Sequence, residues 1–183
     1  MMDLKDKKVL IFAGPDFEDR ELFYPLYRFR EEGATVKVAG LPNESVHTGK
    51  YGIPVTVDGD YGFFVNEHWD CIVVAGGWAP DKVRMNHCAL EIVRKPLEAG
   101  GVASAICHGG WVLASADVIR NRTLTSYKAI KDDMTNAGAN WVDEEVVVDN
   151  SSKGTVVTSR TPDDLPAFCK TLVGLMAKTP AVV

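Results

Sequence analysis

A short segment in the middle of the chain carries residue types that could perform nucleophilic catalysis. The small apolar run 103–106 leads into Cys107 and His108, and two glycines follow. This order predicts a strand that turns sharply into a helix, as at the nucleophile elbow of hydrolases, where the nucleophile is exposed and the next backbone amides face the bound molecule. Because a helix N-terminus favours an anion, we expect the Cys107 thiol to ionise more readily than a free thiol. A cysteine that ends an apolar strand is also commonly a buried packing residue, so the dipeptide alone leaves both interpretations open.

The surrounding sequence alternates between strand and helix patterns. Strands are predicted at residues 9–13, 34–39, 53–57, 71–75, 102–106 and 124–125, and a hairpin joins 145–148 to 155–158. Helices are predicted at residues 18–32, 81–97, 107–118 and 130–136, with a last helix that has Thr161 as its N-cap. Strands separated by helices indicate an α/β fold with a mostly parallel central sheet, plus a β-hairpin excursion, with helices on both faces.

Three features follow strands of this predicted sheet. Glu18 comes after the first strand, Gly76 and Gly77 follow the strand 71–75, and Cys107 follows the strand 102–106. In open α/β sheets, ligands bind beyond the carboxyl ends of the strands. A carboxyl, a glycine turn with free amides and a thiol in one crevice are the groups that attack on a carbonyl requires. This arrangement favours a functional Cys107.

The composition is that of one globular domain. With 183 residues and 46% hydrophobic residues, the chain can bury one sizeable core, so we expect a single domain over residues 1–183. No apolar run approaches the length of a membrane span, and the charged start of the chain lacks the apolar centre of a signal peptide. We therefore expect a soluble, cytoplasmic protein without a membrane partner.

Charge and motif spacing exclude several classes of protein. The 20 basic and 25 acidic residues give a net charge of −5 without a basic stripe, so nucleic acid is not an expected partner. The four cysteines lack C-x-x-C spacing, which argues against zinc and for reduced thiols. No histidine follows His108, although class I glutamine amidotransferases and papain-like proteases need one after the cysteine. Residues 14–17 lack the glycine pattern of a dinucleotide site. We expect no metal and no cofactor.

Several separated motifs agree in order and spacing with one known family. They are Cys107-His108-Gly109, the segment 16–25 around Glu18, the segment 76–81 and the segments 125–127 and 136–138. With residues 141–143 and 158–165, the agreement covers nearly the whole chain. The sequence thus resembles the ThiJ/PfpI superfamily, and in particular its PfpI-type intracellular cysteine protease branch. The resemblance implies a flavodoxin-like three-layer α/β sandwich.

The resemblance also implies a role for each residue of the site. Cys107 would be the nucleophile, His108 its catalytic partner, and Glu18 the residue that hydrogen-bonds the thiol. Asp81 would reach His108 from a neighbouring subunit, so the protein would be a homo-oligomer, either a dimer or a hexamer. Glu21 shares a helical face with Glu18, and only the resemblance favours Glu18 over it.

The same resemblance suggests which groups bind the substrate. Gly77 and His108 would supply amides for the oxyanion, with Gly76 beside them, and Tyr127 is either a pocket hydroxyl or a packed tyrosine. The branch commonly has proline at the positions of Gly110 and Ala75, and these departures bear on substrate specificity.

We therefore expect a cysteine-dependent hydrolase or lyase that acts on small carbonyl or peptide-like substrates. Within the resemblance, the activities are those of a peptidase, a glyoxalase or deglycase working on methylglyoxal and its adducts, or a hydratase. An alternative from a different class is a non-enzymatic redox-sensing or chaperone-like stress-response protein, in which Cys107 is an oxidisable thiol. Catalysis requires His108 and Asp81, whereas sensing requires only an exposed, ionised thiol.

Overall fold

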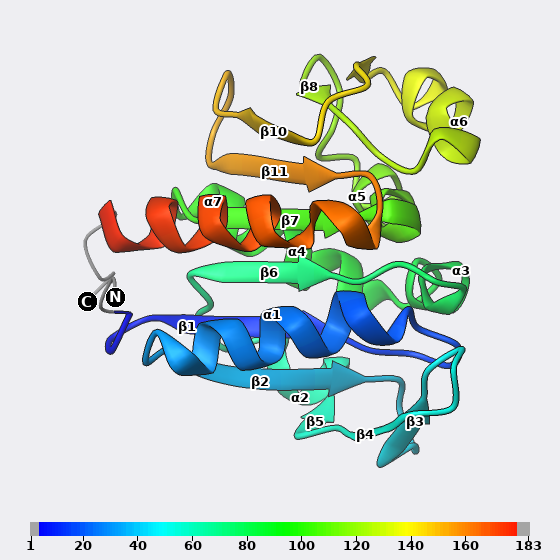
Figure 1. Ribbon diagram of the computed structural model, residues 1–183, viewed down its shortest axis with the longest axis vertical. Coiled ribbons are helices and arrows are strands. Elements are labelled where there is room, and N and C mark those ends of the chain that lie inside the picture. The colour runs from blue at the N-terminus through cyan, green and yellow to red at the C-terminus, as the bar shows by residue number, and fades with distance from the viewer. Residues whose placement is uncertain (1–3, 179–183) are drawn as a thin grey trace.

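A seven-stranded sheet forms the centre of the protein in a computed structural model that describes residues 4–178 (Figure 1). The strands are β1 Lys8–Phe12, β2 Thr35–Gly40, β5 Gly59–Asp60, β6 Cys71–Val74, β7 Val102–Ile106, β10 Val146–Asp149 and β11 Thr155–Ser159. They lie in the order β10-β11-β7-β6-β1-β2-β5, and only β10 and β11 pair antiparallel. The carboxyl ends of β1, β6 and β7 therefore lie at one edge of the sheet, on the right in Figure 1.

Helices cover both faces of this sheet. On one face lie α1 Asp19–Glu31 and α7 Leu165–Lys178, and on the other lie α2 Tyr61–Phe64, α4 His87–Glu98 and α5 Gly110–Ser115 (Figure 1). The buried apolar side chains form two clusters, one on each side of the sheet. The predicted three-layer, flavodoxin-like sandwich is confirmed. None of the helices within residues 4–178 combines the length and apolarity needed to cross a bilayer.

One predicted helix is two helices. The predicted span 81–97 contains α3, Ala79–Val83, and the separate helix α4. The break occurs because Asn86 caps the second helix: its side-chain oxygen accepts a hydrogen bond from the Ala89 amide at 3.1 Å. Pro96 lies in the last turn of α4 without ending it. The short helix α3 leaves the loop after β6 close to the carboxyl edge of the sheet.

The last helix also begins differently from the prediction. A 3₁₀ turn, Pro162–Asp164, precedes α7, and the Thr161 side chain makes no capping hydrogen bond. Asp164 accepts one from the Arg160 amide at 3.1 Å instead. Thr161 and Pro162 consequently lie in a turn at the carboxyl edge, where they line the pocket described below.

Smaller elements lie outside the central sheet. The antiparallel pair β3 Val46–Thr48 and β4 Pro54–Thr56 follows β2, and the parallel pair β8 Thr123–Leu124 and β9 Asn140–Trp141 flanks α6, Lys131–Asn136. The strand predicted at 53–57 is thus one arm of a hairpin. The loop of this hairpin is tied to α1, because Asp19 accepts hydrogen bonds from the amides of Tyr51 at 3.0 Å and Ile53 at 3.2 Å. This tie brings the loop residue Lys50 to the start of α1.

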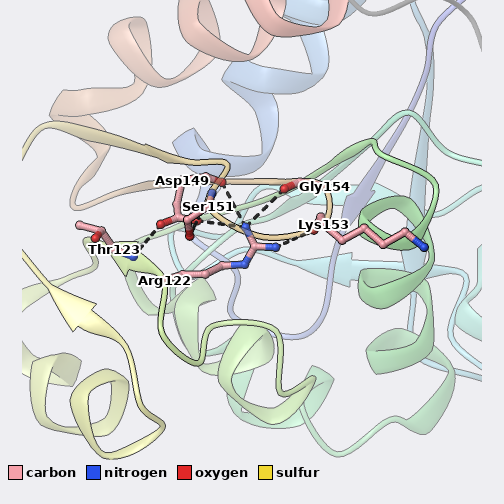
Figure 2. A network of polar contacts seen from close by, with 6 residues as sticks. All are labelled: Arg122, Thr123, Asp149, Ser151, Lys153 and Gly154. Carbon is pink, nitrogen blue, oxygen red and sulfur yellow. Dashed lines mark hydrogen bonds and ion pairs between the residues drawn. The ribbon is translucent and has the colours of Figure 1, made fainter.

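A buried ion pair fixes the β10–β11 hairpin (Figure 2). Arg122 donates through Nη1 to Oδ1 of Asp149 at 3.1 Å and to the Gly154 carbonyl at 3.3 Å, and through Nη2 to the Lys153 carbonyl at 2.6 Å. Asp149 also accepts from the Thr123 amide at 2.8 Å. The network joins the β8 segment to the hairpin whose strand β11 pairs with β7, the strand that ends at the predicted nucleophile.

Candidate active site

Cys107 lies on a strained turn at the end of β7. Its φ is +59°, a left-handed conformation that residues other than glycine rarely adopt. The 3₁₀ turn Cys107–Gly109 follows and leads into α5. A Cβ at position 109 would lie 2.4 Å from the Val74 carbonyl oxygen, so only glycine allows the elbow to pack this closely on β6. The predicted elbow is confirmed, and strain of this kind is concentrated at functional sites.

His108 lies directly beside the thiol. Its Nδ1 is 3.4 Å from Sγ of Cys107. The imidazole is held among three aromatic rings, with centroid distances of 5.5 Å to Trp78, 5.1 Å to Trp111 and 5.0 Å to Tyr127. Burial lowers the pKa of His108, so the ring is neutral at neutral pH. A neutral imidazole at this distance can accept the thiol proton.

The carboxyl that faces the thiol is Glu21. Its side chain is completely buried in the first turn of α1, and its Oε2 accepts a hydrogen bond from the Gly76 amide at 2.7 Å. Burial raises the pKa of Glu21 to about 8, so the carboxyl is protonated at neutral pH, and it also interacts with the Cys107 side chain. Its other oxygen, Oε1, has no hydrogen-bond partner within residues 4–178. A protonated Glu21 can therefore donate a hydrogen bond to the sulfur or to a bound molecule.

Glu18, the carboxyl expected beside the thiol, instead forms two ion pairs in the pocket wall. Its Oε1 lies 2.8 Å from Nε of Arg20, and its Oε2 lies 2.7 Å from Nζ of Lys50. The difference arises at the start of α1. Glu18 is the extended N-cap residue, whereas Glu21 lies within the helix, three residues further on. The helical face that the two residues were expected to share therefore begins at Glu21, and the predicted contact of Glu18 with the thiol is corrected to Glu21.

The surroundings of the Cys107 thiol include groups that raise its pKa and groups that lower it. Burial, and then the negative charge of an ionised Glu21, raise the pKa of Cys107 to about 12, although hydrogen bonds from the His108 and Gly77 amides lower it. Cys107 is half-buried, and desolvation by this burial outweighs the amides at the start of the following turn. While Glu21 remains protonated its negative charge is absent, so the thiol proton is lost more readily than when Glu21 is ionised.

Gly77 supplies one of the amides that face the sulfur. The loop around it pairs with the loop after β1 through a bridge to Phe17. Gly77 has φ +75°, and a Cβ there would lie 2.4 Å from the Asp16 carbonyl oxygen, so the turn requires glycine. The amides of Gly77 and His108 both hydrogen-bond to Sγ. An oxyanion formed on a carbon attached to Sγ would lie within reach of the same amides.

Gly76 has a different role from the one predicted. Its amide is not free, because it donates to Glu21. A Cβ at this position would lie 2.6 Å from Oε2 of Glu21 and 2.8 Å from Cβ of Cys107. Gly76 thus positions the buried carboxyl and leaves room for the thiol.

A pocket of about 360 Å³ opens onto Cys107. Tyr127 lines it, packs its ring on His108, and donates from its amide to the Cys107 carbonyl at 3.3 Å. The pocket also contains Lys50 and Trp78, which sequence analysis missed. Trp78 follows the glycine pair directly, and that position was the available signal. Lys50 lies in a turn-rich stretch that gives no sign of where it packs.

Asp81 does not line this pocket within one chain. Its side chain is 59% exposed and lies 3.3 Å from Nζ of Lys82. Cys107 and His108 are therefore brought together by the fold, whereas Asp81 points to solvent. No group of three or more His, Cys, Asp or Glu side chains that could hold a metal ion occurs within residues 4–178.

Comparisons with known proteins agree with this architecture. Deglycase PfpI from Pyrococcus furiosus is 44% identical over 169 residues, which cover 92% of this chain and 99% of that protein. "Putative cysteine protease YraA" from Bacillus subtilis is 35% identical over 170 residues, covering 93% of this chain and 98% of that protein. The crystal structure of DJ-1beta from Drosophila melanogaster matches with a TM-score of 0.85 at 25% identity, covering 94% of this chain and 91% of that chain. The model of the DJ-1/PfpI family matches residues 7–175. The chain therefore belongs to the DJ-1/PfpI family, which confirms the resemblance that its motifs predicted.

Proposed function

We propose that this protein is a cysteine-dependent enzyme of the deglycase type, acting on small carbonyl adducts such as those of methylglyoxal. The observation that carries the proposal is the contact between Cys107 and His108, 3.4 Å from Sγ to Nδ1, on a turn whose φ of +59° is strained. The names of the relatives support the choice, because Deglycase PfpI matches nearly the full length of the chain. The half-buried thiol lies in a pocket beside a neutral imidazole that can accept its proton, which supports a nucleophile over an oxidant sensor that needs only an exposed thiol.

The proposed first step is attack of the thiol on a carbonyl carbon. As the bond from Sγ to carbon forms, the thiol proton moves to Nδ1 of His108 and the carbonyl π electrons move to oxygen. The amides of Gly77 and His108 stabilise the resulting oxyanion. Neutral Glu21 adds no negative charge beside it, and its proton is available for a hydrogen bond. His108 then holds a proton that it can return when the adduct collapses.

We further propose that the active form is an oligomer in which Asp81 of one subunit orients His108 of another. Asp81 is exposed beside two exposed apolar side chains, Trp78 at 61% and Met85 at 71%. A subunit contact here would bury this apolar surface and bring a carboxylate to the side of the pocket where Trp78 packs on His108.

The four cysteines are all free, which supports a reducing, cytoplasmic location.

The proposed activity predicts which substrate is consumed and which residue consumes it. Purified protein is expected to convert the methylglyoxal hemithioacetal of N-acetylcysteine, and Cys107→Ser is expected to lose this activity by about a thousandfold or more. Cys88→Ser, which removes a half-buried cysteine outside the site, is the matched control and should keep full activity. Product formation by Cys107→Ser at the wild-type rate would overturn the proposal. Cleavage of fluorogenic peptides that depends on Cys107, without conversion of the adduct, would replace the deglycase proposal with a peptidase.

A further inference from the structure

Two cations lie together at the mouth of the pocket. Arg20 and Lys50 both line it, and both pair with the carboxylate of Glu18. Glu18 is only 3% exposed, whereas Arg20 is 57% and Lys50 is 36% exposed. The buried carboxylate thus pairs with two partly exposed cations that line the pocket.

Glu18 leaves most of the hydrogen-bonding capacity of these cations unused. It engages Arg20 through Nε alone, and no hydrogen bond from Nη1 or Nη2 occurs within residues 4–178. These two nitrogens form one edge of the planar guanidinium, which can bind a carboxylate with two parallel hydrogen bonds. The ammonium of Lys50 has three donors, and its ion pair with Glu18 occupies one.

The charge around the thiol favours an anionic ligand. Glu21 is protonated at neutral pH and His108 is neutral, so within one chain the pocket holds two cations and one ionised carboxylate. The carboxylate of Asp163 also stabilises the positive charge of Arg20. Asp163 lines a neighbouring groove and is not part of this pocket.

Both cations contact the ring of Tyr51 in addition to the carboxylate of Glu18. The ring of Tyr51 lies under both, 5.9 Å from Cζ of Arg20 and 4.9 Å from Nζ of Lys50. The Tyr51 amide donates to buried Asp19 at 3.0 Å, and the Lys50 amide donates to the Phe17 carbonyl at 2.9 Å. These contacts reduce the side-chain entropy that the two cations lose when a ligand binds.

We propose that the substrate carries a carboxylate near its reactive carbonyl and that Arg20 and Lys50 bind this carboxylate while the carbonyl lies at Cys107. The inference rests on the proposed function and narrows it to a substrate class: adducts of small carbonyl compounds with free amino acids or with the carboxyl end of a short peptide. An adduct on an internal side chain of a folded protein lacks this adjacent carboxylate and would bind less tightly.

A matched pair of substrates tests the inference. The methylglyoxal hemithioacetals of N-acetylcysteine and of N-acetylcysteinamide share the reacting atoms, and only the first carries a carboxylate. The wild type is expected to show a kcat/KM about tenfold or more higher for the carboxylate, mainly through a lower KM. Arg20→Gln and Lys50→Gln should each bring the ratio of the two kcat/KM values towards one. The ratio isolates recognition, because any effect on the shared chemistry cancels.

The control is Arg30→Gln, which removes an exposed cation at the other end of α1 and should leave the ratio at its wild-type value. Equal kcat/KM for the two substrates in the wild type would overturn the inference while leaving the proposed function standing. A preference for the carboxylate that persists in both pocket variants would also overturn it. Failure of the wild type to convert either substrate would overturn the proposed function and the inference together.

Discussion

Mixing the inactive variants Cys107→Ser and Asp81→Ala is expected to restore about a quarter of the wild-type activity, if subunits pair symmetrically and exchange at random. In a hybrid pair, one site keeps Cys107 and His108 on its own subunit and receives intact Asp81 from the partner. Half of the pairs are then hybrids, and each contains one complete site. The activity of the separate and mixed proteins, measured after refolding them together, checks the expectation.

A second mixture provides the control for this experiment. Cys107→Ser and His108→Ala remove residues that one chain brings together, so no hybrid pair of these variants contains a complete site. This mixture should remain inactive. Asp81→Ala with full activity by itself, or a fully active monomer in sedimentation, would contradict the arrangement across subunits.

Removal of the buried Arg122 charge is expected to cause a large loss of stability. Arg122→Gln should lower the free energy of unfolding by about 3–5 kcal/mol, because it leaves Asp149 buried without its cation and removes the donors that hold the 150–154 loop. Urea unfolding followed by circular dichroism measures the change, and the m-value should stay constant.

The matched control is a surface pair two residues away. Arg120 lies 3.4 Å from Asp117, and their side chains are 62% and 70% exposed. Arg120→Gln should therefore cost less than about 1 kcal/mol. Equal losses for Arg120→Gln and Arg122→Gln would show that the network in Figure 2 does not hold the hairpin.

The parts of the fold that could be predicted from the sequence are those set by local pattern. The buried strands are near-continuous apolar runs, as parallel strands covered on both faces must be, and the elbow at Cys107 follows from such a run meeting glycines. The break between α3 and α4 was missed, although Asn86 is a good N-cap, because the helical spacing runs through it.

Side-chain pairings between distant segments could not be predicted in this way. Arg122 and Asp149 are 27 residues apart, and neither belongs to a pattern that indicates the other. Lys50 reaches the pocket only because the β3–β4 loop is tied to Asp19. The choice between Glu18 and Glu21 depends on the residue at which α1 begins, and a shift of a few residues at a helix start is beyond what spacing alone decides.

The central claim is that Glu21, and not Glu18, controls the ionisation of Cys107. The thiol loses its proton more readily when Glu21 is protonated than when Glu21 is ionised. Titrating the ultraviolet absorbance of the thiolate against pH, with Cys107→Ser as the blank, tests it most directly in the wild type, Glu21→Gln and Glu18→Gln. The charge of ionised Glu21 raises the pKa of Cys107, and an amide cannot ionise but can still donate a hydrogen bond, so Glu21→Gln should lower the thiol pKa. Glu18→Gln should leave it unchanged. A thiol pKa that shifts in Glu18→Gln and stays at the wild-type value in Glu21→Gln would contradict the account.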